Sequence, residues 1–86
     1  MQNHVRIYFD YYGYTHQAEV MCRVCNAPAQ DIHHIEPRSK FGKKRKDEQD
    51  KIENLIALCR TCHDKSHSGE LSKETLRNFN NFLRTF

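Results

Sequence analysis

Two Cys-x-x-Cys motifs, Cys22–Cys25 and Cys59–Cys62, constrain this chain of 86 residues more than any other feature of its sequence. A chain of this length buries so little apolar surface that its core alone leaves it marginally stable. Its mean hydropathy of −0.91 increases that shortage. Two such turns can present four thiolates to one tetrahedral zinc ion and close a structural site. We therefore expect a structural Zn²⁺ that contributes directly to folding.

Two disulfides, or redox chemistry at one motif, are the alternative interpretations of the four cysteines. The N-terminal residues 1–12 lack the charged start, apolar run and cleavage site of a secretory signal. No stretch approaches the ~20 apolar residues of a membrane span. We expect a soluble, cytoplasmic protein without membrane contact, and paired cysteines in a reducing compartment are more often metal ligands than disulfides.

Positive charge is concentrated in a single segment. The formal net charge is only +3, but residues 38–46 hold a run of basic side chains. These are Arg38, Lys40, Lys43, Lys44, Arg45 and Lys46. A polar loop over residues 38–51 can simply be solvated, or it can contact the phosphates of a nucleic acid.

The hydrophobic pattern predicts a small α+β fold that forms a single domain over residues 1–86. Residues 5–12 fit a helix that ends at Gly13, with strand alternation as the alternative. Residues 29–35 predict a strand that ends before Pro37, and residues 54–58 form a second apolar run. A further helix is expected to begin near Cys62 and to end at Gly69.

The C-terminal helix, over about residues 72–85, has the clearest pattern. Ser72 is a favourable N-cap, and Leu71 and Leu76 occupy the positions of a hydrophobic staple. An apolar stripe at helical spacing follows, made of Leu76, Phe79, Leu83 and Phe86. We expect this stripe to pack on the core, and a dimer or partner surface is the alternative.

The histidines suggest a second metal site. His63 and His67 are four residues apart, so on a helix their rings share one face and can hold one ion. A third ligand from the strand, His33 or His34, would leave coordination positions open, which distinguishes catalytic from structural metal. The alternative for an isolated His-His pair is packing within a strand. His4 and His16 are expected to be incidental.

The segment DIHHIEPRS at residues 31–39, followed by NLIALCRTCH at residues 54–63, resembles the signature of HNH endonucleases. It is similar to the branch in which two Cys-x-x-Cys knuckles brace the catalytic motif, and the resemblance covers about residues 20–69. It implies the ββα-metal fold, a hairpin whose long loop leads to a short helix. In this chain that motif would be stapled by the four-cysteine zinc and followed by the C-terminal helix.

The resemblance also implies roles for individual residues. His33 corresponds to the first metal ligand and His34 to the general base, while Asn54 tethers the loop and helps to orient the base. His63 and His67 correspond to the remaining ligands. Adjacent strand residues face opposite sides, so His33 and His34 must border the scissile phosphate from two sides unless the strand twists. Asp31 or a backbone carbonyl would fix the tautomer of one histidine.

The implied activity is hydrolysis of DNA phosphodiester bonds. From the short chain and a single active site we expect nicking with low sequence specificity. His34 would take a proton from water, and one divalent ion would act as Lewis acid. Three imidazoles suit Mn²⁺, Ni²⁺ or Zn²⁺ better than Mg²⁺. A homodimer or a larger protein partner could add specificity, and relatives serve phage packaging, homing and restriction. The alternative is a non-catalytic zinc-ribbon module that binds nucleic acid.

Overall fold

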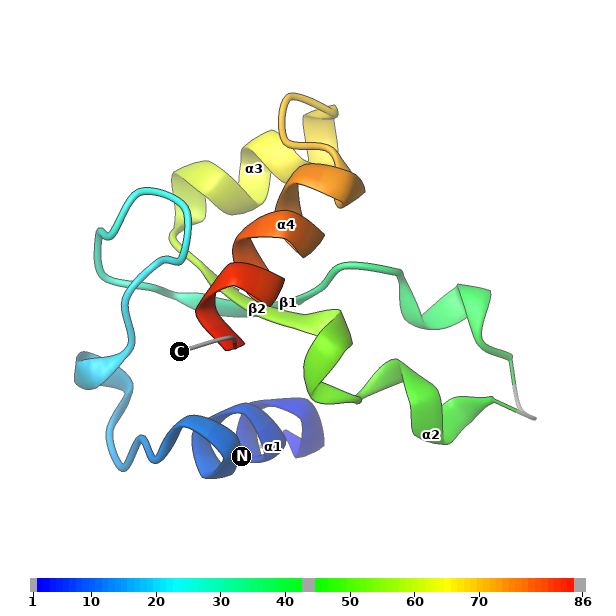
Figure 1. Ribbon diagram of the computed structural model, residues 1–86, viewed down its shortest axis with the longest axis horizontal. Helices are drawn as coiled ribbons and strands as arrows, with labels where there is room; N and C mark the ends of the chain where they lie inside the picture. Colours follow the sequence, from blue (N-terminus) through cyan, green and yellow to red (C-terminus); the bar gives the residue numbers. More distant parts are fainter. Residues whose placement is uncertain (1, 43–44, 85–86) are drawn as a thin grey trace.

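A two-stranded antiparallel ribbon forms the centre of the computed structural model, which describes residues 2–42 and 45–84 (Figure 1). β1 (Asp31–His34) pairs with β2 (Leu55–Leu58), and His33 lies opposite Ile56 in the register. Each strand has four residues. The short ribbon brings the two sequence segments that flank the long loop side by side.

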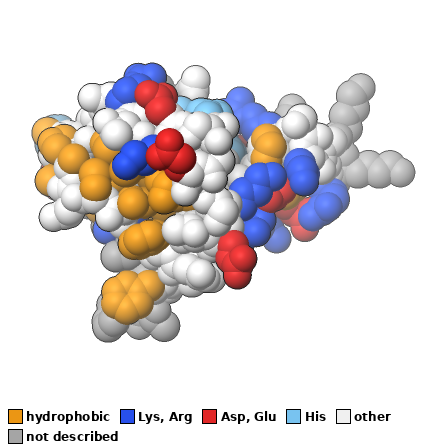
Figure 2. All heavy atoms as spheres, turned by 90° about the horizontal axis from the view of Figure 1, so that it is seen from above, with side chains coloured by type: hydrophobic (Ala, Val, Ile, Leu, Met, Phe, Trp, Pro, Cys, Tyr) orange, Lys and Arg blue, Asp and Glu red, His pale blue; other side chains and the backbone are white. Residues whose placement is uncertain are grey.

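Helices cover both faces of this ribbon. α1 (Asn3–Tyr12) lies on one side, and α3 (Arg60–Ser68) and α4 (Lys73–Arg84) lie on the other (Figure 1). Seen from above, Lys and Arg side chains gather toward the end of the molecule that carries the long loop (Figure 2). The predicted small α+β fold, with a hairpin followed by a helix and a C-terminal helix, is confirmed.

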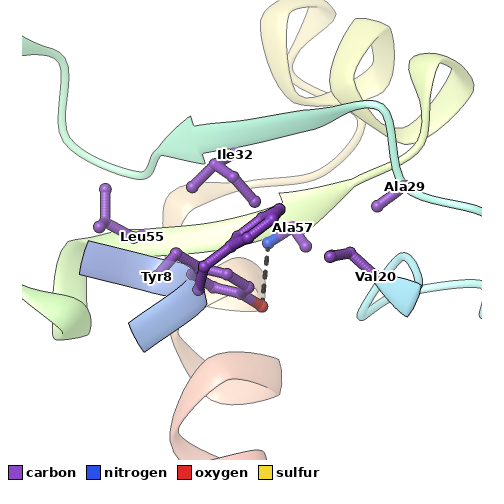
Figure 3. Close-up of a cluster of buried hydrophobic side chains, with 7 residues drawn as sticks. Tyr8, Val20, Ala29, Ile32, Leu55 and Ala57 are labelled. Carbon is purple, nitrogen blue, oxygen red and sulfur yellow. Dashed lines mark hydrogen bonds between the residues drawn. The ribbon is translucent and has the colours of Figure 1, made fainter. Parts of the chain in front are cut away.

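The side chain of Tyr8 joins α1 to the ribbon. It is fully buried, and its hydroxyl accepts a hydrogen bond from the Ala57 backbone N–H at 3.4 Å (Figure 3). The hydroxyl also accepts from Arg23 Nε at 3.1 Å. Gly13 ends the helix with a φ of 77°, a left-handed conformation that glycine adopts at little cost. The helix predicted over residues 5–12, with its stop at Gly13, is confirmed.

Strand alternation divides the buried side chains into two clusters. Ile32, Leu55 and Ala57 pack with Tyr8 on the α1 side. The cluster on the other side contains the cysteines Cys22, Cys59 and Cys62 and the aliphatic residues Ile35, Ile56, Leu58 and Leu76. Because successive residues of a strand face opposite sides, neighbouring side chains of β1 enter different environments.

The first strand is shorter than predicted. It begins at Asp31 instead of residue 29, because the backbone N–H of Ala29 donates to the Val20 carbonyl at 3.0 Å instead of joining the ladder. The segment predicted as an open loop over residues 38–51 contains a 3₁₀ turn at Arg38–Lys40 and the short helix α2 (Lys46–Gln49).

The C-terminal helix requires a correction. Ser72 caps it through a 3.1 Å hydrogen bond from the Thr75 N–H, and Leu76 is buried, as predicted. Phe79, however, is 37% exposed. The next residue, Asn80, is buried instead, with an exposed fraction of 1%. The amide of Asn80 donates to the carbonyl oxygens of Ile52 and Glu53, at 3.4 and 3.2 Å, and so turns this face of α4 inward. Leu83 and Phe86 lie outside the described side chains.

Among the residues that the structure describes, no helix combines the length and the apolar character needed to cross a membrane.

Candidate functional site

The four cysteine side chains converge beside the start of α3. Cys22 and Cys25 come from the turn before β1, while Cys59 caps α3 and Cys62 lies in its first turn. Their sulfur atoms all lie within 4.8 Å of one another, and none of them forms a disulfide. Cys25 Sγ and Cys59 Sγ are 3.5 Å apart. A tetrahedral zinc with Zn–S bonds of ~2.3 Å has edges of about 3.8 Å, so this set fits a structural zinc ion.

The electrostatics of the cysteine cluster agree with a bound cation. Burial raises the pKa of the Cys22 thiol, but hydrogen bonds from the backbone N–H groups of Cys25, Cys59 and Val24 outweigh it and bring that pKa to about 7. Burial, and then contact with the neighbouring sulfur atoms, raises the pKa of Cys62. Four thiolates this close together are favourable only when a cation neutralises them.

The side chains of His33, His63 and His67 form a second cluster, between β1 and α3. Their candidate ligand nitrogens lie within 4.8 Å of one another. His63 Nε2 and His67 Nε2 are 3.1 Å apart. Two imidazoles at adjacent octahedral positions, with metal–nitrogen bonds of ~2.1 Å, have nitrogens about 3.0 Å apart. The donor set therefore fits one divalent ion, with positions left open on the solvent side.

Asp31 fixes the orientation of the His63 ring. Its Oδ2 lies 3.0 Å from His63 Nδ1, and because a carboxylate only accepts, the neutral ring carries its proton on Nδ1 and its lone pair on Nε2. Burial, followed by repulsion from His63 and His67, lowers the pKa of His33 to about 4. His33 is therefore neutral at pH 7, the form in which imidazole ligates metal.

His34 points to the opposite side of the strand from His33. Its Nε2 lies 2.8 Å from Asp50 Oδ1, and its ring centroid is 4.6 Å from that of His4. His33 and His34 nevertheless border the same open pocket of ≈ 380 Å³, together with His63, His67, Pro37 and Arg38. The two adjacent histidines thus reach one pocket from two faces of the strand, without a twist that would turn both the same way.

His4 is not incidental, contrary to the prediction. It is only 7% exposed, it packs against His34, and its Nδ1 lies 3.1 Å from Arg38 Nη2. The sequence did contain a signal for this burial. His4 lies four residues before Tyr8, on the same face of the helix that carries the apolar residues.

Sequence reasoning also missed Asp50 and Asn3. Asp50 accepts a 3.2 Å hydrogen bond from Asn3 Nδ2 through the carboxylate oxygen that does not face His34. An acidic residue at the end of a charged loop carries no pattern of its own. Only the closure of the loop onto α1 brings Asp50 to the histidine.

Asn54 ties the two ends of the long loop together. Its Oδ1 accepts from the Glu36 N–H at 2.8 Å, and its Nδ2 donates to the carbonyls of Glu36 at 3.1 Å and Gln49 at 2.9 Å. Its backbone carbonyl also accepts from the Ile35 N–H at 2.9 Å. These contacts hold the residue just before Asp50 close to the end of β1.

The basic residues of the loop lie in different environments. Arg38 borders the histidine pocket. Lys40 Nζ pairs with Glu36 at 3.6 Å, and the Arg45 guanidinium pairs with Glu48 and lies over the ring of Phe41. Lys43, Lys44 and the side chain of Lys46 lie outside what the structure describes. Histidine side chains reach the molecular surface next to Lys and Arg side chains (Figure 2).

Comparison with known proteins gives one family and one relative. The family model described as HNH endonuclease matches residues 22–69, more than half of the chain. A protein of Sarcophyton glaucum described as mitochondrial DNA mismatch repair protein mutS homolog is 35% identical over 51 residues. That match covers 59% of this chain and 5% of the relative, so the chain spans about a twentieth of that protein. No solved structure matches.

Proposed function

Because the chain belongs to the HNH endonuclease family, we propose that it is a metal-dependent endonuclease that hydrolyses DNA phosphodiester bonds. The observation that carries this proposal is the meeting of three histidines from β1 and α3 around one possible ion position. A fourth histidine, His34, borders the same pocket but belongs to a separate hydrogen-bonded group. One set can hold metal while the other ring stays available for proton transfer.

His33, His63 and His67 would hold the divalent ion, with Asp31 keeping the His63 lone pair directed at it. When bound, the ion supplies Lewis acidity and orients the scissile phosphate. Three neutral imidazoles favour Mn²⁺, Ni²⁺ or Zn²⁺ over Mg²⁺ as that ion. The four cysteines would hold a structural zinc that takes no part in the reaction.

His34 acts as general base. A phosphodiester is anionic and repels hydroxide, so the nucleophile has to be generated next to the phosphorus atom. A neutral imidazole can take one proton from the attacking water. Asn54 holds the loop that carries Asp50, the hydrogen-bond partner of this ring, and so acts on the base indirectly.

Arg38 binds phosphate at the edge of the pocket. Its side chain is held from one side by His4 Nδ1, which is an uncharged partner in the neutral ring. Lys40 and Arg45 already pair with carboxylates, which reduces what they add to phosphate binding. The remaining basic residues of the loop, Lys43, Lys44 and Lys46, are proposed to contact the DNA backbone without reading its sequence.

The described residues of one chain hold one such centre, so we expect the protein to cut one strand at a time with low sequence specificity. Cutting of both strands would need a second copy or a larger protein partner. Supercoiled plasmid, which becomes relaxed after one nick, is therefore the suitable substrate.

The test is plasmid relaxation by the wild-type protein and by His34→Ala in the presence of Mn²⁺. The variant should fold normally by circular dichroism, bind the same amount of metal and cut roughly 10²–10⁴-fold more slowly. His16→Ala, which changes a solvent-exposed histidine, is the matched control and should cut like the wild type. Equal rates for wild type and His34→Ala would refute the nuclease and leave a zinc-ribbon module that only binds nucleic acid.

A further inference from the structure

The carboxylate of Asp50 is held at both oxygens. Oδ1 lies 2.8 Å from His34 Nε2, and Oδ2 accepts from Asn3 Nδ2 at 3.2 Å. The Asp50 and His34 side chains are only 15% and 12% exposed. Both contacts therefore form largely out of water, where a hydrogen bond to a charged group contributes more than at the surface.

The Asp50 carboxyl is ionised at neutral pH. Burial alone would raise its pKa, but the hydrogen bonds from His34 and Asn3 outweigh burial and keep that pKa below the ordinary value. An ionised carboxylate can only accept hydrogen bonds. In a neutral imidazole one nitrogen carries a proton and the other carries a lone pair, so the nitrogen that faces Asp50 must be the protonated one.

We propose that Asp50 is a positioning residue that fixes His34 as the Nε2–H tautomer, so that Nδ1 is the atom that removes the proton from water. This inference rests on the proposed role of His34 as general base. In the reaction, Nδ1 takes one proton from water while the water oxygen bonds to phosphorus. The bond to the leaving 3′ oxygen breaks, and that oxygen takes a proton from solvent. The resulting imidazolium keeps its Nε2–H bond to Asp50 and later loses the Nδ1 proton to solvent.

Several neighbours keep this pair in place. The His4 ring packs against the His34 ring at 4.6 Å, with 48° between the ring planes, which opposes a flip that would exchange the two nitrogens. Asn54 holds the Gln49 carbonyl at 2.9 Å, directly before Asp50 in the chain. Asn3 and His4 both belong to α1, so the first helix takes part in the geometry of the base.

The His4, His34 and Asp50 group also has the composition of a cation site. Two contacts disfavour an ion there. Arg38 Nη2 lies 3.1 Å from His4 Nδ1 and would place a positive charge beside the ion, and the His4 ring also hydrogen-bonds the Ile32 backbone. The group is therefore better described as a hydrogen-bonded network than as a second metal centre.

Nitrogen NMR of the histidine rings tests the assignment directly. In protein labelled with ¹⁵N-histidine at about pH 8, well above the ordinary histidine pKa, the lone-pair nitrogen resonates far downfield of the protonated one. His34→Gln identifies the His34 signals by their loss. The wild type should show His34 protonated on Nε2, and Asp50→Ala should shift the ring toward a mixture of tautomers. His34 protonated on Nδ1 in the wild type, or an unchanged tautomer in Asp50→Ala, would overturn the inference.

Kinetics separate this inference from the proposed function. Asp50→Ala should lower kcat for plasmid nicking by roughly 10–100-fold while KM and bound metal stay the same. Asp50→Asn keeps the shape of the side chain and one acceptor oxygen, so it should recover part of that loss in kcat. It replaces Asp50→Ala in the kinetic comparison if the alanine variant does not fold. Asp10→Asn, an exposed change of equal charge at the far end of α1, is the control.

The two failures are distinguishable. If the wild-type protein has His34 protonated on Nε2 but does not cut DNA, the proposed nuclease function is refuted. The catalytic role of Asp50 is then refuted as well. A wild-type protein that cuts DNA, with an Asp50→Ala variant of equal kcat, would remove only the positioning role.

Discussion

The cysteine cluster and the histidine cluster use the same helix for different purposes. Cys62 and His63 are consecutive residues of α3, yet Cys62 is buried among aliphatic side chains and His63 borders an open pocket. The cysteine set brings four ligands together and leaves no position for water. The histidine set brings three together and leaves positions open. A metal site that stabilises the fold therefore differs from a metal site that can react in its number of ligands and in its burial. The positions of the ligands along the chain distinguish the two sites less.

The comparison extends to the strand. His33 faces α3 and joins the open cluster, whereas His34 faces α1 and joins the hydrogen-bonded network with Asp50. A ribbon of two short strands therefore places two adjacent histidines in two different groups, to which we assign the proposed roles of metal binding and proton transfer. Changes to each group of residues test how independent the two histidine groups and the cysteine site are.

The largest effect is expected for Cys59→Ala. A structural zinc contributes about 10 kcal/mol or more to small domains of this kind, which is comparable to the ~5–15 kcal/mol total stability of a folded protein. The variant should therefore lose its zinc and its helical circular dichroism together. Thr61→Ala, an exposed change between the two cysteines, should keep both. A folded, zinc-free Cys59→Ala protein would show that the cysteine cluster is not what holds the fold.

Removal of weakly bound metal should separate the two clusters. Mild treatment with a chelator is expected to abolish plasmid nicking while the helical signal stays, because the open histidine site exchanges its ion faster than the closed cysteine site. Mn²⁺ or Ni²⁺ should restore nicking at least as well as Mg²⁺. Restoration by Mg²⁺ alone would contradict imidazole ligation by His33.

A moderate effect is expected for Arg38→Ala. The loss of one charged phosphate contact should weaken DNA binding by roughly 10-fold and reduce the salt dependence of the binding constant by about one ion. Arg6→Ala, an exposed arginine of α1, serves as the control. Fluorescence anisotropy over a range of salt concentrations measures both quantities. An equal salt dependence of DNA binding in the two variants would show that Arg38 does not contact the DNA.

The smallest effect concerns Glu36, which accepts from Lys73 and Arg77 of α4 and from Lys40. Burial alone would raise its pKa, but these cations outweigh it and lower the pKa from 4.5. Its contribution to stability is therefore complete above pH 4.5 and is lost as the pH falls through the lower, folded-state pKa. Glu36→Gln should cost up to about 1 kcal/mol at pH 7 and almost nothing at low pH. Urea unfolding at both pH values measures this, and metal binding should not change.

The sequence predicted the elements whose signals are local. The cysteine spacing, the stop signals at Gly13 and Gly69 and the cap at Ser72 each depend on residues within one turn, and all agree with the structure. The position of Phe79 could not be predicted in this way. Helical periodicity predicts the apolar stripe. The face of α4 that packs inward is determined by the hydrogen bond of Asn80 to Ile52, which is distant in sequence.

The surroundings of the base were the least predictable part of the site. Asn3, His4 and Asp50 come from segments more than 30 residues apart in sequence, and polar contacts leave no periodic pattern. His33 and His34 could be identified as a pair by family resemblance, and their different partners follow from strand alternation. The identity of those partners depends on how the loop folds back onto α1.

The central claim is that two ions bind separately, one held by four sulfur atoms and one held by three imidazoles. Native mass spectrometry of the wild type and of His63→Ala, each equilibrated with zinc and then with nickel, counts these ions directly. We predict two ions on the wild type and one on a folded His63→Ala protein. Two ions on both proteins, or one ion on both, would contradict the account.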